Sequence, residues 1–87
     1  MSDNNMTDQV AIVTGAARGF GLAISERLMQ SGVRVFGWDQ EPSPIVGDRR
    51  FLGVERIDVT DQDAVQSAVE AALSTAGQIH ILVNNAG

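Results

Sequence analysis

The sequence predicts an α/β fold in which a parallel sheet of about four strands is flanked by helices. Between residues 9 and 87, short apolar runs alternate with helical patterns in the order β-α-β-loop-β-α-β. This alternation is typical of parallel sheets with right-handed crossovers. The natural strand order is 3-2-1-4, and polar residues follow several of the strands. A ligand crevice is then expected beyond the carboxyl ends of the first and fourth strands, where the order reverses.

Length and composition narrow the possible functions. With 87 residues, the chain forms at most one small domain. A net charge of −5 argues against a nucleic-acid partner, which requires a basic face. There is no cysteine, so we expect no thiol chemistry and no disulfide. We also assign no metal site. Residues 1–8 lack the apolar core of a secretory signal, and no stretch has the ~20 apolar residues of a membrane helix. We expect residues 1–8 to be a disordered arm and the protein to be cytoplasmic.

The first strand, the following turn and the first helix form one motif. Residues 9–14 are almost continuously apolar, as in a strand that is covered on both faces. Three glycines follow with the spacing G-x-x-x-G-x-G: Gly15, Gly19 and Gly21. A helical pattern begins at Phe20 or Gly21 and ends before Gly32, where a left-handed cap is expected. A helix N-terminus after a glycine turn can bind the pyrophosphate of a dinucleotide, because its N–H groups are unpaired and glycine leaves room for phosphate.

A glycine triplet alone is a weak signal. The alternative is a turn found in any α/β protein, with its glycines selected for packing. The position between an apolar strand and a helix favours phosphate binding. Arg18 in this turn could reach a 2′-phosphate, or it could be solvated or paired with a nearby acid.

The second strand, predicted over residues 34–38, is followed by Asp39. An acidic residue about 20 residues beyond the glycine turn can accept hydrogen bonds from the adenosine ribose. Its charge repels a 2′-phosphate, so it predicts NAD rather than NADP. The alternative is an ordinary polar residue at the end of a strand. Residues 40–50 include both prolines and predict a loop, and Trp38 is expected in the core or the crevice wall.

The remaining elements are a strand, a helix and a strand. Residues 51–59 predict a third strand that ends at Asp58-Val59, and Asp58 could either accept from the adenine amino group or cap the next loop. Residues 60–63 resemble a capping box, and a clean apolar stripe then predicts a helix to about Ala76.

Residues 79–83 predict the fourth strand, and Asn84-Asn85-Ala86-Gly87 follows it. His80 is the only histidine. We expect it at the surface, with no catalytic role.

Together these motifs resemble the N-terminal half of a short-chain dehydrogenase/reductase. The resemblance rests on T-G-x-x-x-G-x-G at residues 14–21, on Asp39, on Asp58-Val59 and on N-N-A-G at residues 84–87, and it extends over residues 9–87. It implies a partial Rossmann fold whose cofactor-binding residues are Gly15, Arg18, Gly19, Phe20, Gly21, Asp39, Asp58, Val59, Asn85, Ala86 and Gly87.

The resemblance also implies an activity, namely hydride transfer between NAD(H) and an alcohol or carbonyl substrate, in a protein that is often a homo-oligomer. The tyrosine and lysine that carry the family's catalysis lie beyond N-N-A-G. This chain has no tyrosine and all six of its basic residues are arginines, so no catalytic residue is assigned. We expect a truncated cofactor-binding portion that is inactive alone. The alternative is a non-catalytic nucleotide-binding or interaction module. The N-N-A-G segment weakens a third possibility, half of a methyltransferase or sugar-nucleotide epimerase domain.

Overall fold

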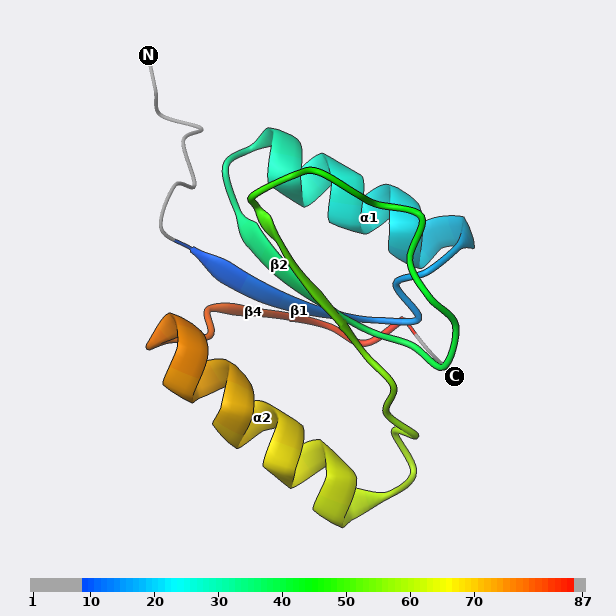
Figure 1. Ribbon diagram of the computed structural model, residues 1–87, viewed down its shortest axis with the longest axis vertical. Coiled ribbons are helices and arrows are strands. Elements are labelled where there is room, and N and C mark those ends of the chain that lie inside the picture. The colour runs from blue at the N-terminus through cyan, green and yellow to red at the C-terminus, as the bar shows by residue number, and fades with distance from the viewer. Residues whose placement is uncertain (1–8, 86–87) are drawn as a thin grey trace.

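A computed structural model describes residues 9–85 as one parallel sheet between two helices (Figure 1). The elements are β1 (Val10–Thr14), α1 (Gly19–Gln30), β2 (Arg34–Trp38), β3 (Phe51–Glu55), α2 (Gln62–Ala76) and β4 (Ile81–Val83). The strand order is β3-β2-β1-β4, which confirms the predicted fold class and order. The arm predicted over residues 1–8 lies outside the described residues.

The central strand β1 is buried along its whole length because a helix covers each face of the sheet. Val10 and Ile12 belong to the cluster that packs against α2, whereas Ala11 and Val13 belong to the cluster that packs against α1. Successive side chains of a strand point to opposite faces, so both faces of β1 must be apolar. This explains the continuous apolar run in the sequence.

The first helix begins at Gly19, slightly before the predicted start, and it ends near the predicted position. Gly32 has a φ of +93°, which confirms the left-handed residue expected there. Inside the helix, the buried Ser25 hydroxyl donates to the Gly21 carbonyl at 2.8 Å. A buried hydroxyl is therefore accommodated without an unpaired polar atom.

The third and fourth strands are shorter than predicted. β3 ends at Glu55 rather than at residue 59, because Glu55 pairs with Trp38, the last residue of β2, and no neighbouring strand extends further. Ile57 then turns into the cluster beneath α2. β4 begins at Ile81 rather than at residue 79, since its pairing with β1 begins at Ala11.

His80, directly before β4, is exposed as predicted but has a structural contact. Its ring Nδ1 accepts a hydrogen bond from the Val10 backbone N–H at 3.0 Å, and the His80 backbone N–H donates to the Val10 carbonyl at 2.9 Å. His80 therefore joins the starts of β1 and β4. The sequence pattern did not indicate this contact.

The second helix is capped by Asp61, one residue after the Thr60 that the predicted capping box would use. The Asp61 carboxylate accepts from the Ala64 N–H at 3.1 Å, while the Thr60 hydroxyl donates to Asp58 instead. Gly77, with a φ of +84°, ends the helix as predicted. Neither helix within residues 9–85 has the length and apolar character needed to cross a membrane.

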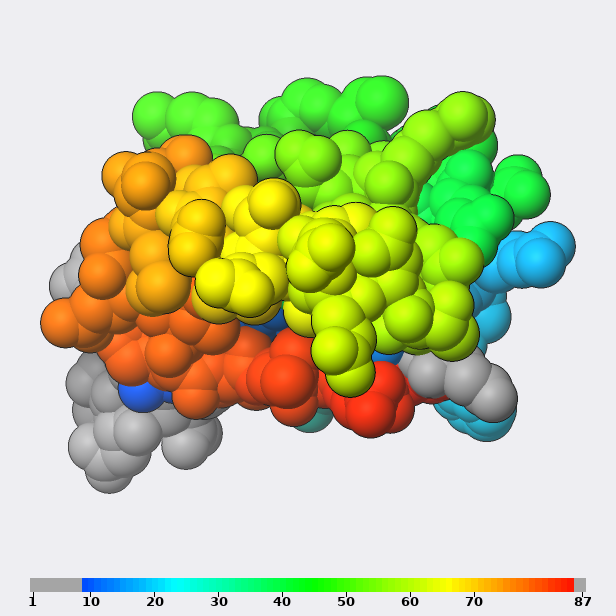
Figure 2. All heavy atoms as spheres, turned by 90° about the horizontal axis from the view of Figure 1, so that it is seen from below, coloured from blue at the N-terminus to red at the C-terminus, as the bar shows by residue number. Residues whose placement is uncertain are grey.

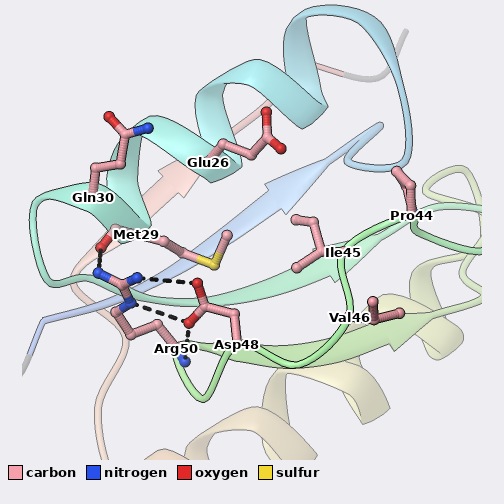
Figure 3. A pocket seen from close by; sticks show the side chains of 8 residues that line it. All are labelled: Glu26, Met29, Gln30, Pro44, Ile45, Val46, Asp48 and Arg50. Atoms are coloured by element: carbon pink, nitrogen blue, oxygen red, sulfur yellow. Dashed lines mark hydrogen bonds and ion pairs between the residues drawn. The ribbon is translucent and has the colours of Figure 1, made fainter.

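The loop between β2 and β3 contains no helix, as predicted, and Arg50 anchors it to α1 (Figure 3). The Arg50 guanidinium donates to the Met29 carbonyl in the last turn of α1 and pairs with the Asp48 carboxylate at 3.1 Å. A cation is favourable at a helix C-terminus, where carbonyl groups are unpaired. A hollow of about 530 Å³ lies between this loop and α1. Its residues are Glu26, Met29, Gln30, Pro44, Ile45, Val46, Asp48 and Arg50.

One of the two edge strands of the sheet is β4, which among residues 9–85 pairs with β1 alone. Figure 2 shows the side of the sheet that α2 covers, with α2 in yellow and orange and β4 in red beside it. An apolar hollow of about 380 Å³ lies along this boundary, and Leu82 of β4 is 64% exposed. An exposed apolar strand edge favours association of chains.

Candidate cofactor-binding site

The carboxyl ends of the strands and the start of α1 meet at one edge of the sheet, on the right in Figure 1. A cavity of about 330 Å³ opens there. Its residues are Gly15, Arg18, Trp38, Asp39, Gln40, Glu41, Ile57, Asp58 and Val59. Five of the residues predicted to contact a cofactor are among them. The buried Trp38 belongs to the core and also forms part of the crevice wall.

The turn after β1 brings the N-terminus of α1 to this edge. Gly15, with a φ of +64°, reverses the chain, and its N–H donates to the Trp38 carbonyl at 2.8 Å. Arg18 is the N-cap of α1, but its side chain makes no capping hydrogen bond and the first turn of the helix holds no acidic residue. The first N–H groups of a helix have no partner within the helix and carry a partial positive charge. The arrangement is suited to binding an anion.

Two glycines at the start of α1 have different structural roles. Gly19 has a φ of +59°, and a Cβ added there would meet open space. A Cβ added at Gly21 would lie 1.8 Å from the Gly15 carbonyl oxygen and 2.8 Å from Asn85 Nδ2. Gly19 thus supplies a backbone conformation, whereas Gly21 allows the helix to pack directly against the turn and the segment after β4. The alternative that the glycines were selected for packing therefore holds for Gly21.

Asp39 lies between the turn after β1 and the turn after β2. Its Oδ2 accepts from the Ala17 N–H at 2.9 Å, and its Oδ1 accepts from the Glu41 N–H at 3.0 Å. Partial burial acts to raise the pKa of Asp39, but these backbone donors and the nearby charge of Arg18 outweigh it and lower the pKa below its ordinary value. The cavity therefore contains a fixed negative charge at neutral pH.

The lowered pKa of Asp39 makes a prediction about stability. An unfolded aspartate has a pKa of about 3.9. The ionised Asp39 therefore stabilises the fold above about pH 4, and this contribution is lost as the pH falls through the lower pKa of the folded chain. We expect the free energy of unfolding to decrease more steeply between about pH 5 and pH 3 in the wild type than in Asp39→Asn, as measured by urea titration. Parallel curves would contradict the contact network, because the other aspartates are common to both proteins.

Asp58 and Val59 line the same cavity as Gly15 of the glycine turn. Asp58 Oδ1 accepts from both the Thr60 N–H at 2.9 Å and the Thr60 hydroxyl at 2.6 Å. These bonds lower the pKa of Asp58. The capping role weighed for Asp58 is thus present in the structure, and its second carboxylate oxygen is not used by that turn. Val59 is 39% exposed and forms an apolar part of the wall.

The other predicted residues are placed differently. Arg18 is exposed at the cavity, with its charge near Asp39, and Phe20 is 82% exposed and does not line the cavity. Asn85 contacts the turn itself, since its Nδ2 donates to the Gly15 carbonyl at 3.4 Å. Ala86 and Gly87 lie outside the described residues.

Sequence reasoning missed the role of Thr14, which is buried at the end of β1. Its hydroxyl donates to the Val83 carbonyl at 3.2 Å and accepts from the Asn85 N–H at 2.8 Å. Thr14 thereby fixes the segment after β4 beside the glycine turn. The available signal was a hydroxyl residue in an otherwise apolar strand.

Comparison with known families identifies this arrangement. The family model for short chain dehydrogenases matches residues 9–87, which is most of the chain. The chain belongs to the short-chain dehydrogenase family. This confirms the resemblance carried by the glycine turn, Asp39 and the N-N-A-G segment, and the family is one of oxidoreductases.

Similar sequences are much longer than this dehydrogenase segment. It is 39% identical over 82 residues to the 3-ketodihydrosphingosine reductase of Bacteroides thetaiotaomicron, covering 94% of this chain and 29% of that protein. It is 36% identical over 87 residues to the 3-oxoacyl-(acyl-carrier-protein) reductase of Escherichia coli, covering 95% and 36%. The chain therefore spans about a third of the length of these relatives.

Solved structures of dehydrogenases share the fold. The aldohexose dehydrogenase of Thermoplasma acidophilum superposes with a TM-score of 0.84 at 35% identity, over 99% of this chain and 31% of that one. The 3-ketoacyl-(acyl-carrier-protein) reductase of Brucella melitensis, solved with NADH, has a TM-score of 0.83 at 34% identity, over 95% and 36%. The four-stranded parallel sheet of this chain thus has the Rossmann topology of these enzymes.

Proposed function

We propose that this chain is the NAD-binding portion of a short-chain dehydrogenase, with the adenosine and pyrophosphate of the cofactor in the cavity beside the glycine turn. The observation that carries the proposal is the joint placement of an uncapped helix N-terminus and the Asp39 carboxylate at one edge of the sheet. The B. melitensis reductase, which shares the fold and a third of the sequence, was solved with NADH.

The pyrophosphate is assigned to the N-terminus of α1. Gly15 and Gly19 present backbone without a Cβ, and Gly21 brings the helix against the turn, so that the first N–H groups of α1 can approach phosphate oxygens. Arg18, exposed next to them, adds a positive charge. In this proposal, Asn85, Ala86 and Gly87 also bind the cofactor.

The adenosine is assigned to the space between Asp39 and Asp58. The Asp39 carboxylate would accept hydrogen bonds from ribose hydroxyls, while Val59 and the free oxygen of Asp58 would face the adenine. An ionised Asp39 would repel a 2′-phosphate, and its two backbone donors keep it from turning away. We therefore propose NAD, with NADP as the weaker ligand.

Hydride transfer is proposed for the longer protein rather than for this chain alone. The resemblance assigns the acid–base step to a tyrosine whose pKa is lowered by a lysine, and this chain contains neither residue. An alcohol or carbonyl compound is the proposed substrate class. The homo-oligomeric state and the cytoplasmic location stay predictions from the sequence.

The cofactor assignment is tested by calorimetric titration of the folded chain with NAD and with NADP. We expect NAD to bind about tenfold more tightly, a difference of about 1.4 kcal/mol. In Asp39→Asn the preference should fall to about twofold, because the repulsion of the 2′-phosphate is removed. Glu70→Gln, on the exposed side of α2, removes one negative charge outside the cavity and should leave the preference unchanged. An unchanged preference in Asp39→Asn would contradict the assignment.

A further inference from the structure

We propose that Asp39 is also the positioning residue of the glycine turn, and that the affinity for pyrophosphate depends on it even when no ribose hydroxyl is present. This inference rests on the proposed cofactor site. It goes further in giving one carboxylate two separable tasks. One task is recognition of the ribose, and the other is holding residues 15–19 in the conformation that receives phosphate.

The contact that supports this proposal links distant parts of the chain. The Ala17 N–H donates to Asp39 Oδ2 at 2.9 Å across 22 residues of sequence. Ala17 is only 6% exposed, so its N–H has little access to water and depends on this acceptor. The second oxygen, Oδ1, accepts from the Glu41 N–H at 3.0 Å, which fixes the orientation of the carboxylate. Asp39 therefore joins the turn after β1 to the turn after β2.

The glycine turn needs such an anchor because its own sequence makes it flexible. Gly15 and Gly19 both have positive φ angles, and glycine reaches such conformations and many others at similar energy. Between them lie residues 16–18, and within residues 9–85 the structure shows a single side-chain hydrogen bond to this segment, the one from Ala17 to Asp39. The Arg18 side chain does not cap the adjacent N-terminus of α1. Removal of the Asp39 acceptor would leave residues 16–18 held by the packing of Ala16 and Ala17, without a side-chain hydrogen bond.

The two tasks of Asp39 are compatible. Each carboxylate oxygen has two lone pairs, so Asp39 can keep both backbone donors and still accept from a ribose hydroxyl. A nucleotide that lacks these hydroxyls isolates the positioning task. The direction of the change in phosphate affinity also distinguishes the two tasks. Loss of a negative charge near a phosphate should strengthen the binding of phosphate by electrostatics alone, whereas loss of the anchor should weaken it.

The first test is hydrogen exchange of the backbone amides in the ligand-free wild-type chain, followed by NMR. We expect the Ala17 N–H to exchange at least tenfold more slowly than the neighbouring Arg18 N–H, for which the structure shows no side-chain acceptor. An Ala17 amide that exchanges as fast as Arg18 would overturn the proposal. This readout needs no ligand, so it stays valid even if the cofactor assignment fails.

The second test compares Asp39→Asn with Asp39→Leu by titration with 2′,3′-dideoxyadenosine diphosphate. The two side chains have the same number and branching of heavy atoms and the same charge, but only asparagine retains an acceptor for the Ala17 N–H. We expect about fivefold weaker binding by Asp39→Leu and unchanged or tighter binding by Asp39→Asn. Equal affinities in the two variants would overturn the proposal. If the wild type binds neither this probe nor adenosine diphosphate, the proposed function fails, and the exchange of Ala17 alone decides the positioning role. If Asp39→Leu does not fold, the exchange of the Ala17 amide in the wild-type chain decides the positioning role instead.

Discussion

Gly21→Ala is expected to destabilise the chain by more than about 3 kcal/mol and to remove cofactor binding. The added Cβ would lie 1.8 Å from the Gly15 carbonyl oxygen and 2.6 Å from its carbon. Both are backbone atoms of a turn fixed to β2, so they cannot rotate away as a flexible side chain would. Overpacking of a core typically costs about 1–3 kcal/mol, and a clash with backbone costs more. A chain of 87 residues has little stability to lose.

The matched control for this prediction is Gly47→Ala in the loop between β2 and β3. Gly47 also has a positive φ, +73°, but a Cβ there would meet open space. Only the left-handed conformation is then unfavourable, at about 1–2 kcal/mol. Urea unfolding followed by circular dichroism measures both variants. Equal destabilisation of the two would show that α1 does not pack against the glycine turn as described.

Thr14→Val is expected to cost about 1–3 kcal/mol of folding free energy, although the two side chains have nearly the same shape. The Thr14 hydroxyl donates to the Val83 carbonyl and accepts from the Asn85 N–H, and Thr14 is only 3% exposed. Valine would remove both of these hydrogen bonds, which are only partly buried, and a typical hydrogen bond contributes about 0.5–1.5 kcal/mol. Hydrogen exchange at Asn85 should accelerate in the variant, because this N–H loses its acceptor.

Thr14→Ser is the control, because it keeps the hydroxyl and removes only a methyl group. We expect serine to cost about 1 kcal/mol, the value for one buried methylene-sized group. Cofactor affinity should follow the same order, since Thr14 fixes the segment after β4 beside the glycine turn. A valine variant as stable as the serine variant would mean that packing, and not the hydroxyl, holds β1 and β4 together at this end.

The sequence located most elements because each has a local physical signal. The fully apolar run of β1, the apolar stripe of α2 and the glycines at positions 32 and 77 all carry their structural reason in the chain itself. The end of β3 and the start of β4 were predicted incorrectly, because the pairing with a neighbouring strand sets these limits and the chain's own sequence does not. A strand ends where its neighbour ends, and β3 stops at Glu55 because β2 stops at Trp38.

The site was predicted less completely than the fold. The spacing of the glycines, with Asp39 and Asp58 beyond later strands, correctly indicated which residues would approach one edge of the sheet. It did not indicate that Phe20 is exposed and does not line the cavity, because one helix residue differs from the next only in the face on which it lies. It also left the roles of the individual glycines open.

The sequence by itself determined the fold class, the strand order and five of the residues that line the crevice, because hydrophobic periodicity and turn chemistry are local properties of the chain. Only the tertiary structure decided what these residues contact. The hydrogen bonds of Thr14 to the segment after β4, of Asp39 to Ala17 and of His80 to Val10 all join residues far apart in sequence. Such pairs form only when parallel strands bring their ends to the same edge of the sheet, and no local pattern records the distance between them.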